Sequence, residues 1–171
     1  MKKVVIFGKP GSGKSVLSKK LASATGIKLH ALDSIVYKQN GELVDRDIYD
    51  KSHEAILMSD RWIIDGFGPM TSFYKRLDVA DTLIYIDLPY VSSYWFVTKR
   101  LLKGLVVKPE GWPEGSSVFK GTWQSYKVLK RCPMFWNESF MAKLEQLSTS
   151  KSVYVIRSVS ELNHFVDKNV N

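Results

Sequence analysis

The sequence contains a single cysteine, Cys132, among its 171 residues. One cysteine excludes an internal disulfide, and we expect a small buried side chain in a reducing, cytoplasmic environment. The three histidines, His30, His53 and His164, show no metal-ligand spacing with one another or with Cys132, so they predict no metal centre. No apolar run reaches the roughly 18 residues that a membrane-spanning helix needs, so no membrane partner is expected.

The sequence also lacks internal repeats and low-complexity stretches, so we predict one domain over residues 1–171. Apolar residues make up 44% of the chain and charged residues 25%, which is typical of a globular protein with a sizeable core. Basic residues exceed acidic ones, 25 to 17, and give a net charge of +8 at pH 7. This balance favours partners that carry phosphate.

One glycine-rich stretch, GKPGSGKS at residues 8–15, matches the phosphate-binding pattern G-x-x-x-x-G-K-[ST] in full. An apolar, β-branched run over 4–7 precedes it and predicts a buried strand. A helical pattern from Val16 to Ala24 follows it and ends at Gly26. The alternative is a glycine-rich turn that binds nothing, but the flanking strand and helix favour phosphate binding.

The chemistry of nucleotide binding explains this spacing. Glycines let successive backbone amides turn toward phosphate oxygens, and the following helix adds the positive end of its dipole. Lys14 can reach the β- and γ-phosphates, and the hydroxyl of Ser15 can occupy one Mg²⁺ coordination position. No guanine-reading N-K-x-D stretch is present, which favours adenine. We therefore predict that ATP and Mg²⁺ bind at Gly8, Pro10, Gly11, Ser12, Gly13, Lys14, Ser15 and Val16.

Hydrophobic periodicity predicts an α/β protein. Strands are expected at about 4–7, 27–32, 62–64, 82–86 and 152–156, with helical segments between them and a closing helix at 159–168. This alternation indicates a parallel sheet covered on both faces. In a helix over 46–58, the expected buried positions are Ile48, Ala55 and Ile56. Pro133 is expected to separate helices at about 122–131 and 134–148.

Three aspartates follow predicted strands at the sheet edge where parallel sheets bind ligands: Asp33, Asp65 and Asp87. Asp65 directly follows the third strand and is the best candidate to hold Mg²⁺, with a capping role in the turn as the alternative. Asp33 could orient or deprotonate an acceptor hydroxyl, or it could cap a helix or turn. Asp87 precedes a Leu-Pro pair and is interpreted as a structural strand end.

Positive charge is concentrated between Lys99 and Arg131, where eight basic residues accompany only two acidic ones, Glu110 and Glu114. Such a segment can contact the phosphates of a nucleotide or of a nucleic acid, or it can form a solvated face. Residues 105–121 within it carry glycines, two prolines and a tryptophan, which is typical of a loop or a small lid. No helix-turn-helix, zinc-finger or RNA-recognition signature is present.

Later motifs resemble those of adenylate kinases. The stretch DGFGP at residues 65–69 is similar to their Asp-Gly-Phe-Pro-Arg signature, at about the right distance from the phosphate-binding pattern. More closely, and nearly end to end, the chain resembles the adenylate-kinase-related bacterial proteins named as DNA topology modulation proteins. The stretches that carry this resemblance are LD at 32–33, RWIIDG at 61–66, RL at 76–77, ADTLIYIDLP at 80–89 and KR at 99–100.

The resemblance implies a three-layer P-loop NTPase fold of the nucleoside-monophosphate-kinase type, with parallel strands in order 2-3-1-4-5 and a lid insertion at about 104–131. By position, it implies that Lys14 and Ser15 hold phosphates and Mg²⁺ and that Asp65 is the metal-side carboxylate. It places Arg100 at the base of the lid, against the nucleotide. It also implies that Arg76 lies near the place where such kinases use an arginine on the acceptor phosphate, a role that suits the planar guanidinium fork. The catalytic candidates are thus Lys14, Asp33, Asp65 and Arg100, and the substrate-binding candidates are Asp33 and Arg76.

These features support two functions of different classes. The first is an ATP-dependent phosphotransferase that moves the γ-phosphoryl group to a small acceptor, either a nucleotide or a hydroxyl-bearing metabolite. The alternative is a nucleotide-dependent regulatory protein that binds DNA through the basic segment 99–131, as the name of the resembling family suggests. A nucleotide switch without an acceptor is a third hypothesis.

Overall fold

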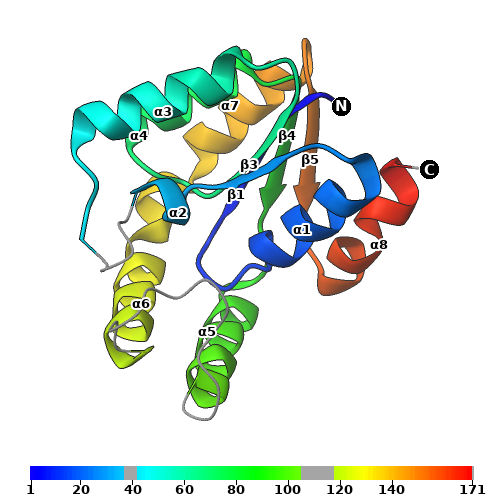
Figure 1. The fold of residues 1–171 in the computed structure, drawn as a ribbon. Helices are drawn as coiled ribbons and strands as arrows, with labels where there is room; N and C mark the ends of the chain where they lie inside the picture. The colour runs from blue at the N-terminus through cyan, green and yellow to red at the C-terminus, as the bar shows by residue number, and fades with distance from the viewer. Residues whose placement is uncertain (37–41, 105–117, 171) are drawn as a thin grey trace.

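The computed structural model describes residues 1–36, 42–104 and 118–170, without the side chains of Asp33, Ser34, Val118 and Lys120. This part of the chain is an α/β structure around one five-stranded sheet, in which every strand pairing is parallel. The strand order is β2-β3-β1-β4-β5 (Figure 1). The predicted α/β class, parallel sheet and strand order are therefore confirmed.

The sheet is short-stranded and largely buried. Its strands are β1 (Lys3–Gly8), β2 (Leu29–Ala31), β3 (Trp62–Asp65), β4 (Thr82–Ile86) and β5 (Ser152–Ile156). Every residue of β3 and β4 is buried, because the faces of a parallel sheet are both covered by helices. The central strand is β1, in which Val5 lies in register with Ile64 on one side and Leu83 on the other.

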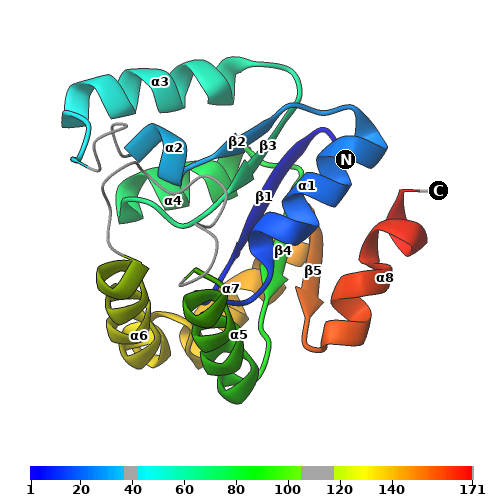
Figure 2. The same ribbon diagram turned by 60° about the horizontal axis from the view of Figure 1, so that its bottom comes forward.

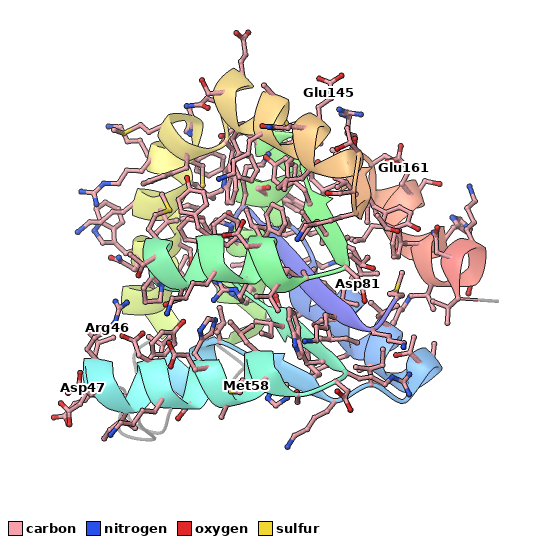
Figure 3. All side chains as sticks on the ribbon, turned by 90° about the horizontal axis from the view of Figure 1, so that it is seen from above. Arg46, Asp47, Met58, Asp81, Glu145 and Glu161 are labelled. Carbon is pink, nitrogen blue, oxygen red and sulfur yellow. The ribbon has the colours of Figure 1, made fainter. Side chains whose placement is uncertain are left out.

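Helices cover both faces of the sheet (Figures 1 and 2). One face is covered by α3 (Arg46–Met58), α4 (Met70–Val79) and α7 (Glu138–Ser148), which lie next to one another in Figure 3. The other face is covered by α1 (Lys14–Thr25) and α8 (Val159–Asn169). Successive β1 side chains serve the two layers alternately: Val5 and Phe7 join the first core cluster, and Val4 and Ile6 join the second.

Two further helices, α5 (Tyr90–Gly104) and α6 (Val118–Phe135), lie side by side and extend away from the sheet (Figures 1 and 2). The rings of Tyr94 and Tyr126 stack at 5.7 Å, and Thr98 Oγ1 lies 2.7 Å from Tyr126 Oη. Of the predicted lid at 104–131, residues 105–117 lie outside the described residues, and 118–131 belong to α6. No helix in the described ranges has both the length and the apolarity to cross a bilayer.

The prediction that Pro133 separates two helices was wrong. α6 runs through Pro133 and ends at Phe135, and the break falls at Asn137. The side-chain oxygen of Asn137 accepts a hydrogen bond from the amide of Phe140 at 3.0 Å and so starts α7. A proline near a helix C-terminus removes one backbone hydrogen bond, whereas the capping residue defines the next helix.

The predicted buried face of α3 was wrong at two of its three positions. Ile48 is 55% exposed and Ala55 is exposed as well, whereas Ile56 is half-buried and packs against the first core cluster. The buried residues recur at a spacing of four and are Tyr49, His53 and Leu57. The buried face of the helix is therefore shifted by about one residue from the predicted face. The stacked polar rings of Tyr49 and His53, 5.6 Å apart, pack inward, and Ile48 faces solvent. The remaining element, α2, spans Asp33–Val36.

Candidate functional site

The glycine-rich residues 8–15 connect β1 to α1 at the carboxyl edge of the sheet. Gly11 and Gly13 have φ angles of +72° and +86°, a left-handed conformation that glycine adopts without strain. A Cβ atom at Gly11 would lie 2.6 Å from the carbonyl oxygen of Ser93 on α5. The loop backbone therefore touches α5 directly, and position 11 accommodates only glycine.

The first turn of α1 follows this loop without a side-chain cap. Gly13 is its N-cap residue, and among the described residues no side chain caps its first amides. By contrast, the hydroxyl of Ser158 caps α8 by accepting from the amide of Glu161 at 3.1 Å. An uncapped helix N-terminus presents backbone donors and a positive dipole end to an anion. The fully buried hydroxyl of Ser12 also has no hydrogen-bond partner among the described residues.

Lys14 lies across the loop that precedes it. Its ammonium group donates hydrogen bonds to the carbonyl oxygens of Gly8 at 3.1 Å and Lys9 at 2.8 Å. Ser15 and Val16 follow on the exposed side of the first turn of α1. The structure therefore brings a lysine, a serine hydroxyl and an uncapped helix start together at the carboxyl end of the central strand.

Asp65 is buried at the end of β3 and faces the same helix turn. Its Oδ2 atom accepts a hydrogen bond from the hydroxyl of Ser18 at 3.2 Å, and that hydroxyl also lies 3.3 Å from the carbonyl oxygen of Ser15. Ser18 thus joins Asp65 to the start of α1. Ser18 was not among the predicted site residues; its position three residues after Ser15 on the same helix is the signal that could have identified it.

The described side chains at this place are too few to hold a metal ion by themselves. The described side chains contain no group of three or more His, Cys, Asp or Glu residues that could hold a metal ion. Ser15 and Asp65 are hard oxygen donors on adjacent elements, which suits Mg²⁺ when phosphate oxygens and water complete its shell. The donor set present therefore fits Mg²⁺ only as a companion of a bound phosphate.

The buried Lys9 and the half-buried Asp87 form an ion pair beside the loop. Only 2% of the Lys9 side chain is exposed, and its ammonium lies 4.7 Å from the centre of the Tyr90 ring. Tyr85 donates a hydrogen bond to Asp87 at 3.0 Å, and burial together with Asp87 raises the pKa of this phenol, so it remains a donor. Sequence analysis gave Lys9 no role, and the pairing agrees with a structural role for Asp87.

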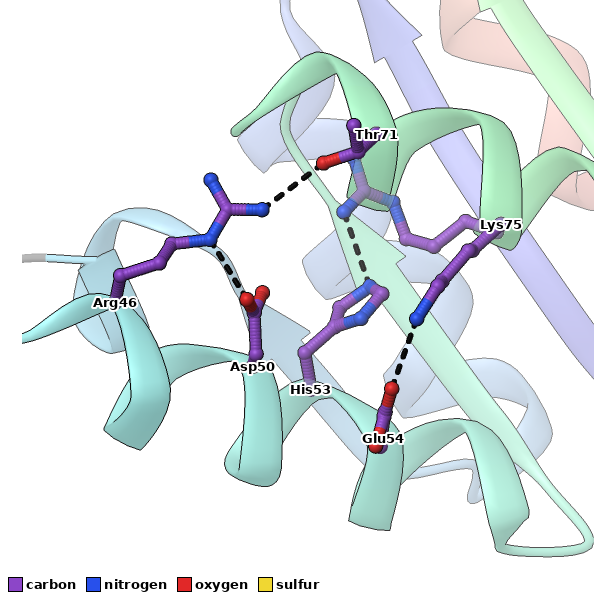
Figure 4. Close-up of polar contacts among 7 residues, drawn as sticks. Arg46, Asp50, His53, Glu54, Thr71 and Lys75 are labelled. Atoms are coloured by element: carbon purple, nitrogen blue, oxygen red, sulfur yellow. Dashed lines mark hydrogen bonds and ion pairs between the residues drawn. The ribbon is translucent and has the colours of Figure 1, made fainter.

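Arg76 is fully buried between α3 and α4. One guanidinium nitrogen lies 3.2 Å from Nε2 of His53, a contact drawn in Figure 4, and another donates to the carbonyl oxygen of Phe67 in the loop after β3. Burial lowers the pKa of Arg76 to about 10. Burial and the charge of Arg76 lower the pKa of His53 to about 4, so its ring is a neutral acceptor. In this structure the Arg76 side chain holds the loop and has no surface open to a substrate.

The remaining predicted site residues, Arg100 and Asp33, lie on helices other than α1. Arg100 is half-buried on α5, and its guanidinium donates to the hydroxyl of Ser125 on α6 at 2.9 Å. Asp33 is the first residue of α2, immediately beyond β2, and its side chain lies outside the described residues. Cys132 is buried on α6, and burial raises the pKa of its thiol. The structure thus places Lys14 and Ser15 at the start of the helix that Asp65 contacts through Ser18, whereas Arg100 connects α5 to α6.

The chain matches no model of a known protein family, and it matches no curated protein. Its site is therefore interpreted from its own geometry. Lys14 and Ser15 begin α1, and Asp65 is joined to that helix through Ser18. Arg76 lies between α3 and α4, and Arg100 bridges α5 to α6.

Proposed function

We propose that this protein is a P-loop phosphotransferase, similar to adenylate kinases, that binds ATP with Mg²⁺ and transfers its γ-phosphoryl group to a small acceptor. The acceptor would be a nucleotide or a metabolite with a hydroxyl group. The observation that carries the proposal is the uncapped start of α1 after the left-handed glycines, with the Lys14 ammonium beside it. Such an arrangement favours a ligand with several closely spaced anionic oxygens.

The residues of the loop would hold the polyphosphate. Backbone amides at the start of α1 and the buried hydroxyl of Ser12 can donate to phosphate oxygens. Lys14 would exchange its two carbonyl acceptors, those of Gly8 and Lys9, for the β- and γ-phosphates. Because a charged acceptor attracts an ammonium group more strongly than a carbonyl does, this exchange would favour the bound state.

The Ser15 hydroxyl and the Asp65 carboxylate would hold Mg²⁺, which would supply charge neutralisation at the phosphoryl group. Ser18 would keep Asp65 oriented through its hydrogen bond of 3.2 Å. On the acceptor side, Asp33 follows β2 and would orient or deprotonate the acceptor hydroxyl. Arg76 would shape this side indirectly, because it fixes the loop that follows Asp65 by binding the carbonyl of Phe67.

Replacing Lys14 tests this assignment. In the Lys14→Ala variant we expect calorimetry to give roughly 10- to 100-fold weaker binding of Mg²⁺ and ATP, since a hydrogen bond to a charged group is lost. Turnover of ATP with a panel of nucleotide and hydroxyl acceptors should be abolished, and the thermal unfolding curve should be unchanged. Lys20→Ala is the matched control, because Lys20 is exposed on the same helix. Native-like binding and turnover in Lys14→Ala would remove the proposal.

The DNA-binding alternative would use the exposed basic surface of α6 and not the glycine-rich loop. Lys127, Lys130 and Arg131 are exposed on α6, and the Lys127 ammonium lies 5.9 Å from the ring of the exposed Trp123. Exposed cations beside an aromatic ring suit a nucleic-acid backbone and its bases. Binding of this kind weakens steeply as salt increases. Titration of a fluorescent oligonucleotide at two salt concentrations, with and without ATP, decides this alternative, and the absence of binding at low salt excludes it.

A further inference from the structure

A cavity of about 350 Å³ lies on the side of the molecule where α4 meets the junction of α6 and α7. Phe67, in the loop after β3, forms part of its wall and is two residues beyond Asp65 in the sequence. Its volume lies within the range of small-molecule pockets in proteins. The lining residues are Phe67, Met70, Phe73, Tyr74, Met134, Phe135, Trp136, Asn137, Ser139, Phe140 and Lys143.

The walls of this cavity are mainly aromatic, and the rings are fixed by one another. Trp136 packs edge-on against Phe67 at 5.3 Å and against Phe140 at 4.8 Å. Behind the cavity, Trp136 also contacts the buried rings of Phe7 at 5.7 Å and Tyr85 at 5.2 Å. Because Phe7 and Tyr85 belong to the central strands, the wall is anchored to the sheet and exists before any ligand binds.

The mouth of the cavity exposes apolar side chains that a monomer ordinarily covers. Met134 is 75% exposed and Phe135 is 42% exposed, and both lie at the end of α6. Met70 and Tyr74 are exposed on α4 at the opposite wall. Exposed apolar residues gathered around a concave site indicate a binding surface more often than scattered ones do.

One cation marks the polar end of the cavity. Among the described residues of the lining, Lys143 is the one charged side chain, and its ammonium lies 4.1 Å from the centre of the Tyr74 ring. The described side chains offer it no carboxylate within ion-pair distance. Ser139 and Asn137 are uncharged polar residues of the lining, and Asn137 is already engaged: it accepts from the amide of Phe140 and donates to the carbonyl of Met134 at 3.1 Å. The cavity therefore combines rigid aromatic walls with a single positive charge.

We propose that this cavity is a binding site for a small planar aromatic compound that carries a negative charge. The ring would lie among Phe67, Phe135 and Trp136, because fixed rings offer both faces and edges to a flat π-system. The anionic group would pair with the ammonium of Lys143. This site is separate from the glycine-rich loop and does not depend on the proposed phosphotransfer.

Equilibrium dialysis with 2-naphthoate and its neutral analogue 2-naphthamide, both followed by naphthyl absorbance and without nucleotide, tests the proposal. The native protein should bind the carboxylate about fivefold more tightly than the amide, as expected for one partly exposed ion pair. Lys143→Gln should remove this preference and leave amide binding unchanged. Phe135→Ala should weaken both ligands roughly fivefold, because one wall is lost.

Lys127→Gln is the matched control, because Lys127 also lies over an aromatic ring, that of Trp123, on α6 but outside the cavity. It should leave the binding of both compounds unchanged. Thermal unfolding followed by circular dichroism verifies that each variant is folded. The proposal would be overturned if the native protein bound both compounds equally well, or showed no saturable binding up to roughly 1 mM ligand. It would also be overturned if Lys127→Gln lost the preference for the carboxylate as Lys143→Gln does, or if Phe135→Ala bound both compounds like the native protein. None of these outcomes bears on ATP binding, which the Lys14 variant tests separately.

Discussion

Two buried cations beside the carboxyl edge of the sheet are accommodated in different ways. Lys9, in the loop after β1, is paired with the carboxylate of Asp87. Arg76 reaches the loop after β3, and its guanidinium contacts the His53 ring and the carbonyl of Phe67. Among the described residues, no carboxylate lies within ion-pair distance of Arg76. One charge is neutralised, and the other is only solvated by neutral acceptors.

The difference shows that the contacts holding the two loops respond to different perturbations, one to substitution and the other to low pH. A buried ion pair is stable as a pair, but the loss of one partner leaves a charge in an apolar environment. A guanidinium surrounded by neutral acceptors instead depends on those acceptors remaining neutral. Its pKa is lowered to about 10 by burial, and the pKa of His53 is lowered to about 4. The first loop is therefore sensitive to substitution and the second to acid.

Asp87→Asn should give the largest effect. The substitution leaves the Lys9 ammonium buried without a carboxylate, which costs about 3 kcal/mol of unfolding free energy. Urea unfolding at pH 7 measures this loss. The double variant Lys9→Met with Asp87→Leu removes both charges and should recover most of the stability. A loss below about 1 kcal/mol in Asp87→Asn would show that the pair contributes little.

The pH dependence of stability should give the next largest effect. Between pH 6.5 and about 4, the unfolded chain binds a proton at His53 that the folded protein excludes. The unfolding free energy therefore falls as the pH decreases through this window, by up to about 3 kcal/mol. His53→Gln keeps an acceptor for Arg76 and should flatten the curve. A weaker slope of the same sign should remain, because burial and Lys28 also lower the pKa of His30. A curve unchanged by His53→Gln would contradict this account.

Arg76→Met should give the smallest of the three effects. It leaves the carbonyl of Phe67 without its donor, but it also removes a buried charge, so we expect a loss of about 2 kcal/mol in urea unfolding. Lys75→Ala is the matched control on the same helix. Lys75 is 60% exposed and pairs with Glu54 of α3 at 2.8 Å (Figure 4), and its loss should not shift the urea midpoint measurably. An Arg76→Met loss larger than that of Asp87→Asn would reverse the comparison.

Local patterns in the sequence were sufficient for most elements. The apolar run before GKPGSGKS predicts β1, and Gly26 ends α1 in the left-handed conformation, with φ of +66°, that a C-terminal glycine adopts. Asp65 is found at the end of β3, as predicted. The strand order, by contrast, came from the resemblance to adenylate-kinase-related proteins and not from periodicity.

Contacts between distant segments could not be predicted in this way. Lys9 and Asp87 are 78 positions apart, and Arg76 and His53 are 23 apart, so no local spacing links them. The rotation of α3 is decided by which rings fit against α4, and that information lies in packing and not in the apolar pattern. The predicted binding roles of Asp33, Arg76 and Arg100 stay predictions, because they concern ligands.

Gly11 approaches the α5 backbone so closely that the loop and the helix cannot slide past each other. α5 is in turn attached to α6 through the stacked rings of Tyr94 and Tyr126 and through Arg100 and Ser125. We therefore expect the two helices to behave as one unit that is held at residue 11 and, through Trp136 just after α6, at the sheet. A ligand that displaces the loop would therefore act on both helices at once, and their far end, well beyond the sheet in Figure 1, lies farthest from both attachments.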